Sequence, residues 1–307
     1  MYKASLRVLT AVTLTSGCGL TPDIQEQEAD QALSADFVDG SGMVTVRIKQ
    51  CPGVTVAEHN TTTCAVDNDF VLIGGGAEVV GEADPGALLT ASFPDSSLTT
   101  WTASSKDHIL AYAHRLNAYS VGLKLAGLSA STLRGSMVMV TTRSAPAEHP
   151  SIAVTAPPGF NLIGGGARAN WISEGQLLYA SFPRSSQWVA ASKDHVMAET
   201  GTVDAFAIGI TTSAIPGFGT LDVNTSQIST FVPGGYGTAS LAAPAGWVLA
   251  SVGANAQGTT EGRLLTDLIP FVDAPADTAQ GITVRSKDHR THDSGSTFAY
   301  VTAVRKH

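Results

Sequence analysis

The tetrapeptide Ser-Lys-Asp-His occurs three times in this chain, each time at the end of a similar run of residues. The copies end at His108, His195 and His289, which are 87 and then 94 residues apart. The upstream residues also match: FVLIGGGAEVV, GALLTASFPDSS and WTASSKDH in the first run correspond to FNLIGGGARAN, GQLLYASFPRSS and WVAASKDH in the second. The third run reads WVLASVGANAQ, GRLLTDLIPFVD and ITVRSKDH. Self-similarity at a nearly constant period is typical of repeat architectures, so the sequence predicts three internal repeats of about 90 residues.

Each repeat contains about six short runs of β-forming residues, separated by Gly, Pro, Asp and Ser, and no amphipathic helix of useful length. This pattern predicts an all-β protein. We expect the β repeats at residues 42–125, 126–210 and 211–307. Two arrangements fit the pattern: a prism-like closed body with pseudo-threefold symmetry, or three tandem small sandwiches. The joints between repeats are short and keep equivalent apolar faces adjacent, which favours the closed body.

The N-terminus has the layout of a bacterial export signal. Lys3 and Arg7 precede a short apolar run, and the small residues Ser16 and Gly17 precede Cys18. Residues 1–18 therefore predict a lipoprotein signal in which Cys18 is lipidated, with an ordinary export signal as the alternative. Either interpretation predicts a location in the cell envelope, as an outer-membrane lipoprotein, or secretion.

Residues 19–41 are acidic and lack apolar periodicity, which predicts a flexible tether between the signal and the β repeats. Cys51 and Cys64 follow, on either side of a short excursion between two expected strands. In an exported protein such a pair predicts a disulfide bond, with two buried free thiols as the alternative.

Composition narrows the classes of partner. The formal net charge is −8, which argues against nucleic acid as a partner. No apolar run approaches the roughly 20 residues of a membrane-spanning helix, so a lipid at Cys18 is the one membrane attachment that we expect. The GGGA runs lack the following Lys and Ser or Thr of a phosphate-binding loop, and they predict a bulge or a close backbone contact instead.

The Ser-Lys-Asp-His copies divide into two sets of side chains if the preceding strand stays regular. Side chains alternate across a strand, and the large apolar residue at the head of each run marks the core side. The aspartates should then point inward and hold a turn or the serine two residues back, as structural residues: Asp107, Asp194 and Asp288. The lysines and histidines should point outward, as ligand-binding candidates: Lys106, His108, Lys193, His195, Lys287 and His289.

No recognised catalytic constellation is present, since the chain has neither a G-x-S-x-G elbow nor an H-E-x-x-H helix motif. The sequence predicts no cofactor and favours a noncatalytic binding module, with a carbohydrate or another envelope component as the partner. Trp171 has no counterpart in the other repeats and is either a sugar-stacking platform or a packed loop residue. Two alternatives stay open: a purely structural or protein-binding envelope protein, and a metal-assisted hydrolase that uses His108, His195 and His289 together.

Overall fold

A computed structural model describes residues 33–80, 86–260, 262–272 and 279–307. The chain divides into a unit of residues 1–30 and a unit of residues 31–307, and the described residues belong to the second unit. The predicted signal at residues 1–18, with its lipidation site Cys18, lies outside the described residues. The predicted tether at residues 19–41 is described only from residue 33 onward, and there it differs from the expectation. Ser34–Val38 forms strand β1, because its backbone pairs with the next strand.

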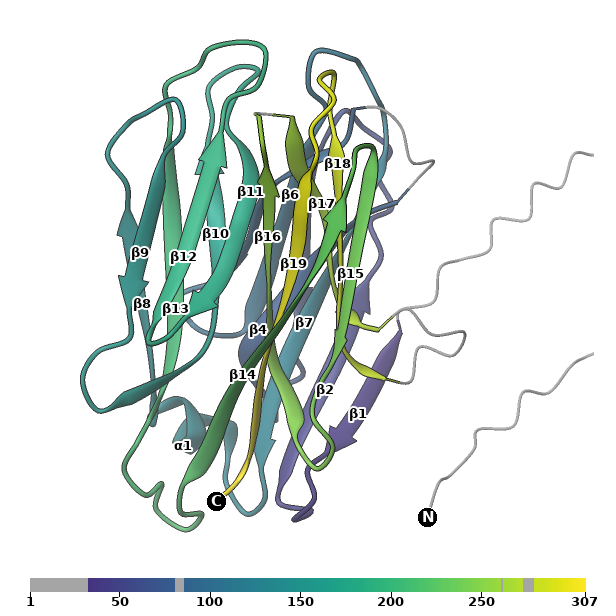
Figure 1. The fold of residues 1–307 in the computed structure, drawn as a ribbon. Helices are drawn as coiled ribbons and strands as arrows, with labels where there is room; N and C mark the ends of the chain where they lie inside the picture. The colour runs from purple at the N-terminus through teal and green to yellow at the C-terminus, as the bar shows by residue number, and fades with distance from the viewer. Residues whose placement is uncertain (1–32, 81–85, 261, 273–278) are drawn as a thin grey trace, which may run out of the picture. The chain divides into compact units, whose positions relative to one another are not determined.

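The described residues form an all-β fold, as predicted, and most of them lie in strands (Figure 1). They contain one helix, α1 (Ala130–Arg134), and none long and apolar enough to cross a membrane. Sheet I holds, in spatial order, β1 (Ser34–Val38), β2 (Val44–Cys51), β7 (Arg115–Leu125), β4 (Val71–Val80), β17 (Arg263–Phe271), β18 (Gln280–Asp288) and β15 (Tyr236–Ala242). Sheet II holds β3 (His59–Ala65), β6 (Thr100–Lys106), β5 (Leu88–Pro94), β10 (Phe160–Asn170), β13 (Thr202–Thr211) and β8 (Met137–Arg143). Sheet III holds β14 (Leu221–Val232), β19 (Gly295–Lys306), β16 (Val248–Gly258), β11 (Leu177–Arg184), β12 (Gln187–Lys193) and β9 (Ser151–Thr155).

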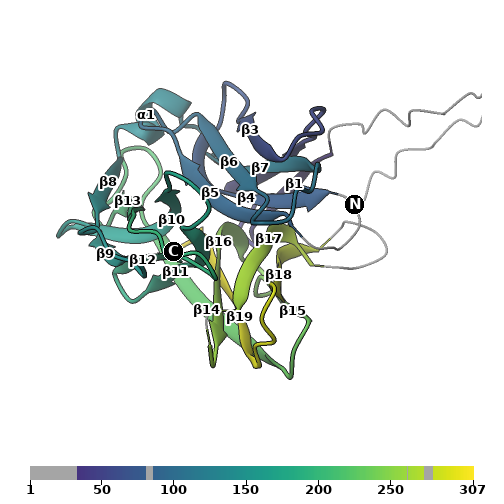
Figure 2. The same cartoon turned by 90° about the horizontal axis from the view of Figure 1, so that it is seen from above.

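Each sheet joins strands from two of the three predicted repeats. The junctions are short antiparallel pairings of β4 with β17, β10 with β5 and β11 with β16. Seen from above, the three sheets of this unit lie around a shared interior (Figure 2). Three tandem sandwiches would each keep their own strands, so that alternative is wrong for this fold.

One hydrophobic core lies between the sheets and takes residues from all three. Two tryptophans at its centre, Trp101 and Trp188, are almost fully buried. Each lies against a glycine: a Cβ atom on Gly75 or Gly165 would come within 2.4 Å of the indole ring. The GGGA runs are therefore not turns but parts of strands β4 and β10, where they form bulges and allow close contact, as their composition predicts.

The predicted disulfide between Cys51 and Cys64 is confirmed, with Cα atoms 5.4 Å apart. Cys51 ends β2 in sheet I and Cys64 lies in β3 in sheet II. The bond therefore fastens the edge region of one sheet to the edge strand of another.

Candidate functional site

The three Ser-Lys-Asp-His copies come together, although they lie far apart in the sequence. Each copy stands at the end of β6, β12 or β18. The imidazole centroids of His108, His195 and His289 lie 5.2–5.5 Å from one another. All three side chains are at least 98% buried. We call these three residues the histidine cluster.

A closed cycle of hydrogen bonds links the histidine cluster. Nε2 of His108 lies 2.5 Å from the carbonyl oxygen of His195, Nε2 of His195 contacts the carbonyl oxygen of His289, and Nε2 of His289 lies 2.9 Å from that of His108. A carbonyl oxygen only accepts, so each Nε2 must carry its proton and donate. Nδ1 of His108 also faces a carbonyl, that of Glu174 at 2.7 Å.

A strained turn follows each histidine. Ile109, Val196 and Arg290 have φ values of 66°, 65° and 60°. The N–H two residues after each histidine donates back to the histidine carbonyl, at 2.7, 2.7 and 2.6 Å. This is a γ-turn with positive φ at its centre, which is rare and costly for β-branched side chains. The turns aim each histidine carbonyl at the neighbouring ring, so local strain is held in place by the cycle.

The lysines do not face solvent, so the outward prediction is wrong for them and for the histidines. Lys106 is 1% exposed, and its Nζ donates to the carbonyl oxygens of Ser173, Glu174 and Gly175 at 2.7–2.8 Å. Burial lowers the pKa of Lys106 to about 8, against the opposing effect of nearby carboxylates. The sequence argument failed because strand ends that meet at a shared centre leave neither face open to solvent.

Lys193 and Lys287 are buried in the same way. The Nζ atoms of Lys106 and Lys193 also lie over aromatic rings, 4.2 Å from the centroid of Trp171 and 5.2 Å from that of Tyr179. An ammonium over an aromatic face is a favourable contact that also orients the ring.

The aspartates make the turn contacts expected of them. The carboxylates of Asp107, Asp194 and Asp288 each accept the backbone N–H of the residue five positions later, at 3.1–3.2 Å. Two of them also contact a half-exposed histidine from a neighbouring segment: Asp107 with Nε2 of His59 at 3.1 Å, and Asp194 with Nε2 of His149 at 2.8 Å.

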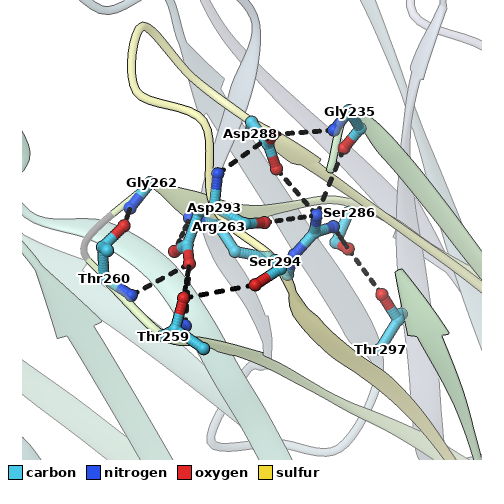
Figure 3. A network of polar contacts seen from close by, with 10 residues as sticks. All are labelled: Gly235, Thr259, Thr260, Gly262, Arg263, Ser286, Asp288, Asp293, Ser294 and Thr297. Carbon is cyan, nitrogen blue, oxygen red and sulfur yellow. Dashed lines mark hydrogen bonds and ion pairs between the residues drawn. The ribbon is translucent and has the colours of Figure 1, made fainter. Parts of the chain in front are cut away.

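The serines bond to a different partner in each copy, not to the aspartates. Ser105 contacts Nε2 of His114 at 2.7 Å, and Ser192 donates to Oε1 of Gln176 at 2.7 Å. In the third copy Ser286 accepts from Nη1 of Arg263, whose buried guanidinium also donates to Asp288 at 2.7 Å (Figure 3).

Sequence reasoning missed these partners, although one signal was available. The variable position in the matching strings GALL, GQLL and GRLL holds Ala87, Gln176 and Arg263. Beside Ala87 the serine is satisfied by His114 instead. The residue at this position decides whether the buried serine of the same copy finds its hydrogen-bond partner there: Gln176 and Arg263 provide one, and Ala87 does not.

Two pockets open beside the buried lysines. The first, of about 210 Å³, lies next to Lys106 and has Trp171 and His59 in its wall; their rings meet edge to face at 5.3 Å. We call it the Trp171 pocket, and it is also lined by Asn60, Thr61, Thr90, Ser104, Ser105 and Arg168. The second, the Tyr179 pocket, has a volume of about 310 Å³ and is lined by His149, Tyr179, Lys193, Ala256, Gln257, Gly258 and Thr260.

The two pockets are built alike. In each, a half-exposed histidine is held by a Ser-Lys-Asp-His aspartate, and an aromatic ring lies under the lysine ammonium. The side chains of His59 and His149 are 54% and 43% exposed, so both can meet a ligand. Aromatic area beside a few fixed polar groups is what small-molecule sites offer.

The histidine cluster is not arranged to ligate a metal ion. A metal needs an unprotonated ring nitrogen, and each Nε2 faces a carbonyl oxygen. Within the described ranges no group of three His, Cys, Asp or Glu side chains is placed to hold a metal. Comparisons with known proteins add no assignment: no family model matches the chain, and no curated protein matches it.

Proposed function

We propose that the described unit is a single closed body of three structural repeats, related by a pseudo-threefold axis that passes through the histidine cluster. Three observations support this. The inter-repeat junctions fall at corresponding strands, the histidine hydrogen bonds run in one cyclic direction, and each following turn has the same positive φ. In this arrangement the Ser-Lys-Asp-His side chains fasten the repeats to one another.

We infer that this body serves as a noncatalytic binding module, with a carbohydrate as the ligand. The observation that carries the inference is the pair of similar pockets, each with an aromatic wall and several polar side chains. A pyranose ring has an apolar C–H face and a rim of hydroxyl groups. Trp171 and Tyr179 offer the matching apolar surface, and neighbouring side chains offer hydrogen bonds.

The lysines and histidines of the tetrapeptides act in this proposal through their neighbours. Lys106 fixes the loop at residues 173–175 and the ring of Trp171, and Lys193 holds Tyr179. The groups proposed to touch a sugar are the aromatic rings and the exposed histidines His59 and His149. Two equivalent pockets on one rigid body would bind a repeating polymer more tightly than either pocket alone.

A direct test is titration with neutral glycans, followed by variants of the pocket walls. We expect Trp171→Ala and Tyr179→Ala each to weaken binding by about tenfold, which corresponds to about 1.4 kcal/mol. Trp247→Ala, which removes a ring held under Arg305 outside both pockets, is the matched control and should leave binding unchanged. Equal affinities for all three variants and the native protein would exclude the two pockets.

The chief competing function is a purely structural or protein-binding role in the envelope. One observation favours it: the tetrapeptide side chains form hydrogen bonds within the protein rather than facing a ligand. Absence of glycan binding in the native protein, across a broad panel, would select this alternative. The metal-assisted hydrolase has no such support, because its three histidine Nε2 atoms already donate.

We also propose that the protein is exported and anchored through lipid at Cys18. The support is the order of basic residues, apolar run and small residues before that cysteine. Mass spectrometry of the mature N-terminus tests it. A first residue other than a diacylglyceryl-modified Cys18 would show that the anchor is absent.

A further inference from the structure

An aromatic pair occurs in each of the three sheets. The rings are Tyr119 and Phe271 in sheet I, Phe93 and Phe206 in sheet II, and Phe182 and Tyr300 in sheet III, with centroids 6.4, 5.0 and 4.8 Å apart. One ring of each pair stands opposite a glycine in the neighbouring strand: Gly76, Gly166 or Gly253.

Two of these glycines, Gly166 and Gly253, allow the second ring to approach from the adjoining strand. A Cβ atom on Gly253 would lie 2.8 Å from the Cα atom of Phe182, and one on Gly166 would lie 2.7 Å from the Cα atom of Phe93. In sheet II the pair points away from the core, because Gly165, one residue before Gly166, faces the core tryptophan Trp188. In sheet I the rings of Tyr119 and Phe271 belong to the hydrophobic core and are almost fully buried.

Two of the three pairs are covered by the residue two positions after the β-strand glycine. In sheet II this residue is Arg168, whose guanidinium lies 5.1 Å from the ring of Phe93 and is paired with Asp204 at 2.6 Å. In sheet I it is Glu78, which accepts from the hydroxyl of Tyr119 at 2.5 Å. A charged side chain with its own partners thus occupies the space beside each of these pairs.

Sheet III has a short neutral residue, Asn255, at the same register position. Asn255 is 5% exposed, and its Oδ1 has no hydrogen-bond partner within the described part of the chain. A pocket of about 460 Å³ opens beside the uncovered pair, and we call it the sheet III groove. Its lining combines Phe182 and Tyr300 with polar side chains: Arg184, Ser185, Thr225, Ser226 and Gln227.

The geometry points to the sheet III groove as a second glycan-binding site, selective for neutral pyranose chains. Phe182 and Tyr300 supply an apolar surface for the C–H face of a sugar. Thr225 and Gln227, which are exposed on strand β14, supply hydrogen bonds. The groove lies on the outer face of a sheet, apart from the Trp171 and Tyr179 pockets, so this inference does not rest on them.

The sheets themselves supply the test. Asn255→Arg introduces into sheet III an arginine equivalent to Arg168, which covers the aromatic pair in sheet II. The new side chain should fill the sheet III groove. Phe182→Ala removes half of the aromatic surface. We expect each variant to weaken glycan binding at the groove by about tenfold or more. Ser229→Ala, on the same exposed strand but outside the groove lining, is the control and should bind as the native protein does.

The probes are soluble oligosaccharides of β-linked glucose, xylose, galactose and N-acetylglucosamine, titrated calorimetrically against the full mature chain. Thermal unfolding verifies that each variant is folded, and Phe182→Ala decides the matter if Asn255→Arg does not fold. Unchanged affinity for every probe in both groove variants overturns the inference. If only Trp171→Ala and Tyr179→Ala lose binding, the two pockets are binding sites and the sheet III groove is not. If only the groove variants lose binding, the groove is a binding site and the two pockets are not. A native protein that binds none of the probes would refute both sites.

Discussion

Nε2 of His289 lies 2.9 Å from the carbonyl oxygen of His108, and this contact joins residues 181 positions apart in the sequence. It completes the cycle of three histidine hydrogen bonds at the point where the three sheets meet. Because every ring donates to a neighbouring histidine carbonyl, the removal of one ring leaves one carbonyl with only the N–H of its own γ-turn and removes the restraint on that turn. The cluster therefore makes the folding of each strand end dependent on the other two tetrapeptide copies.

The histidine cluster predicts a loss of stability in acid. Burial, the neighbouring rings of His108 and His195 and the ammonium of Lys287 lower the pKa of His289 to about 4. The unfolded chain therefore takes up this proton first as the pH falls below 6.5, and stability is lost between pH 6.5 and 4. The shift corresponds to about 3 kcal/mol. Urea unfolding between pH 7.5 and 4 measures it, and His289→Gln should flatten the curve in that window.

The buried carboxyl group of Asp267 changes stability with pH in the opposite direction to His289. Replacing Asp267 therefore makes the effect of His289 easier to measure. Burial and the nearby carboxylate of Glu78 raise the pKa of Asp267 to about 7. The folded state then holds a proton that the unfolded chain has released, so this group's contribution to stability is present below pH 3.8 and lost as the pH rises to 7. We expect Asp267→Asn to unfold at higher urea concentration than the native protein at pH 8, by on the order of 2–4 kcal/mol, and to show little gain at pH 4. A gain that is equal at both pH values would contradict the proposed protonation of Asp267.

Much of the architecture could be predicted from the sequence because the repeats are local patterns. Strand alternation, turn residues and the spacing of Cys51 and Cys64 depend on nearby residues, so the all-β class and the disulfide followed directly. The burial of Lys106 and His108 did not follow, because their surroundings come from other repeats. Alternation along a single strand says which face a side chain takes, but not whether another strand end lies against that face.

The aspartate contacts predict that both charged residues of a tetrapeptide stabilise the fold. Asp107→Ala would remove the carboxylate that accepts the N–H of Tyr112, and Lys106→Met would remove the shared donor of three carbonyls in the loop at residues 173–175. We expect each change to cost about 1–3 kcal/mol in thermal unfolding. Lys49→Ala, which removes a surface ion pair with Asp67 and a weak contact with the carbonyl of Ala65, is the control and should cost under about 1 kcal/mol. A melting temperature for Lys106→Met close to that of the control would mean that this lysine does not support the loop.

The disulfide predicts a second contribution to stability that is independent of the histidine cluster. It closes a loop with a sequence separation of 13 residues. The loop-entropy model gives about 3 kcal/mol for a loop of this size. The double variant Cys51→Ala, Cys64→Ala should therefore unfold at lower urea concentration than the native oxidised protein, and a reducing agent should have no further effect on it. If reduction of the native protein leaves its unfolding midpoint unchanged, the bond does not contribute in this way.

Close packing around Gly75 predicts that even a small substitution there is damaging. A Cβ atom on Gly75 would lie 2.3 Å from the carbonyl oxygen of Tyr119 and 2.4 Å from the ring of Trp101. Neither neighbour can move away, since one belongs to a paired strand and the other is held in the core by its indole N–H bond to Ser92 at 2.9 Å. We expect Gly75→Ala to cost more than about 3 kcal/mol, at the upper end of overpacking effects. Gly40→Ala, where the nearest atom would lie 3.6 Å from the new carbon, is the matched control and should unfold at nearly the native temperature. If Gly75→Ala has the same melting temperature as the control, the contact between Trp101 and the strand backbone is looser than described. The core between the three sheets could then accommodate a methyl group at this position.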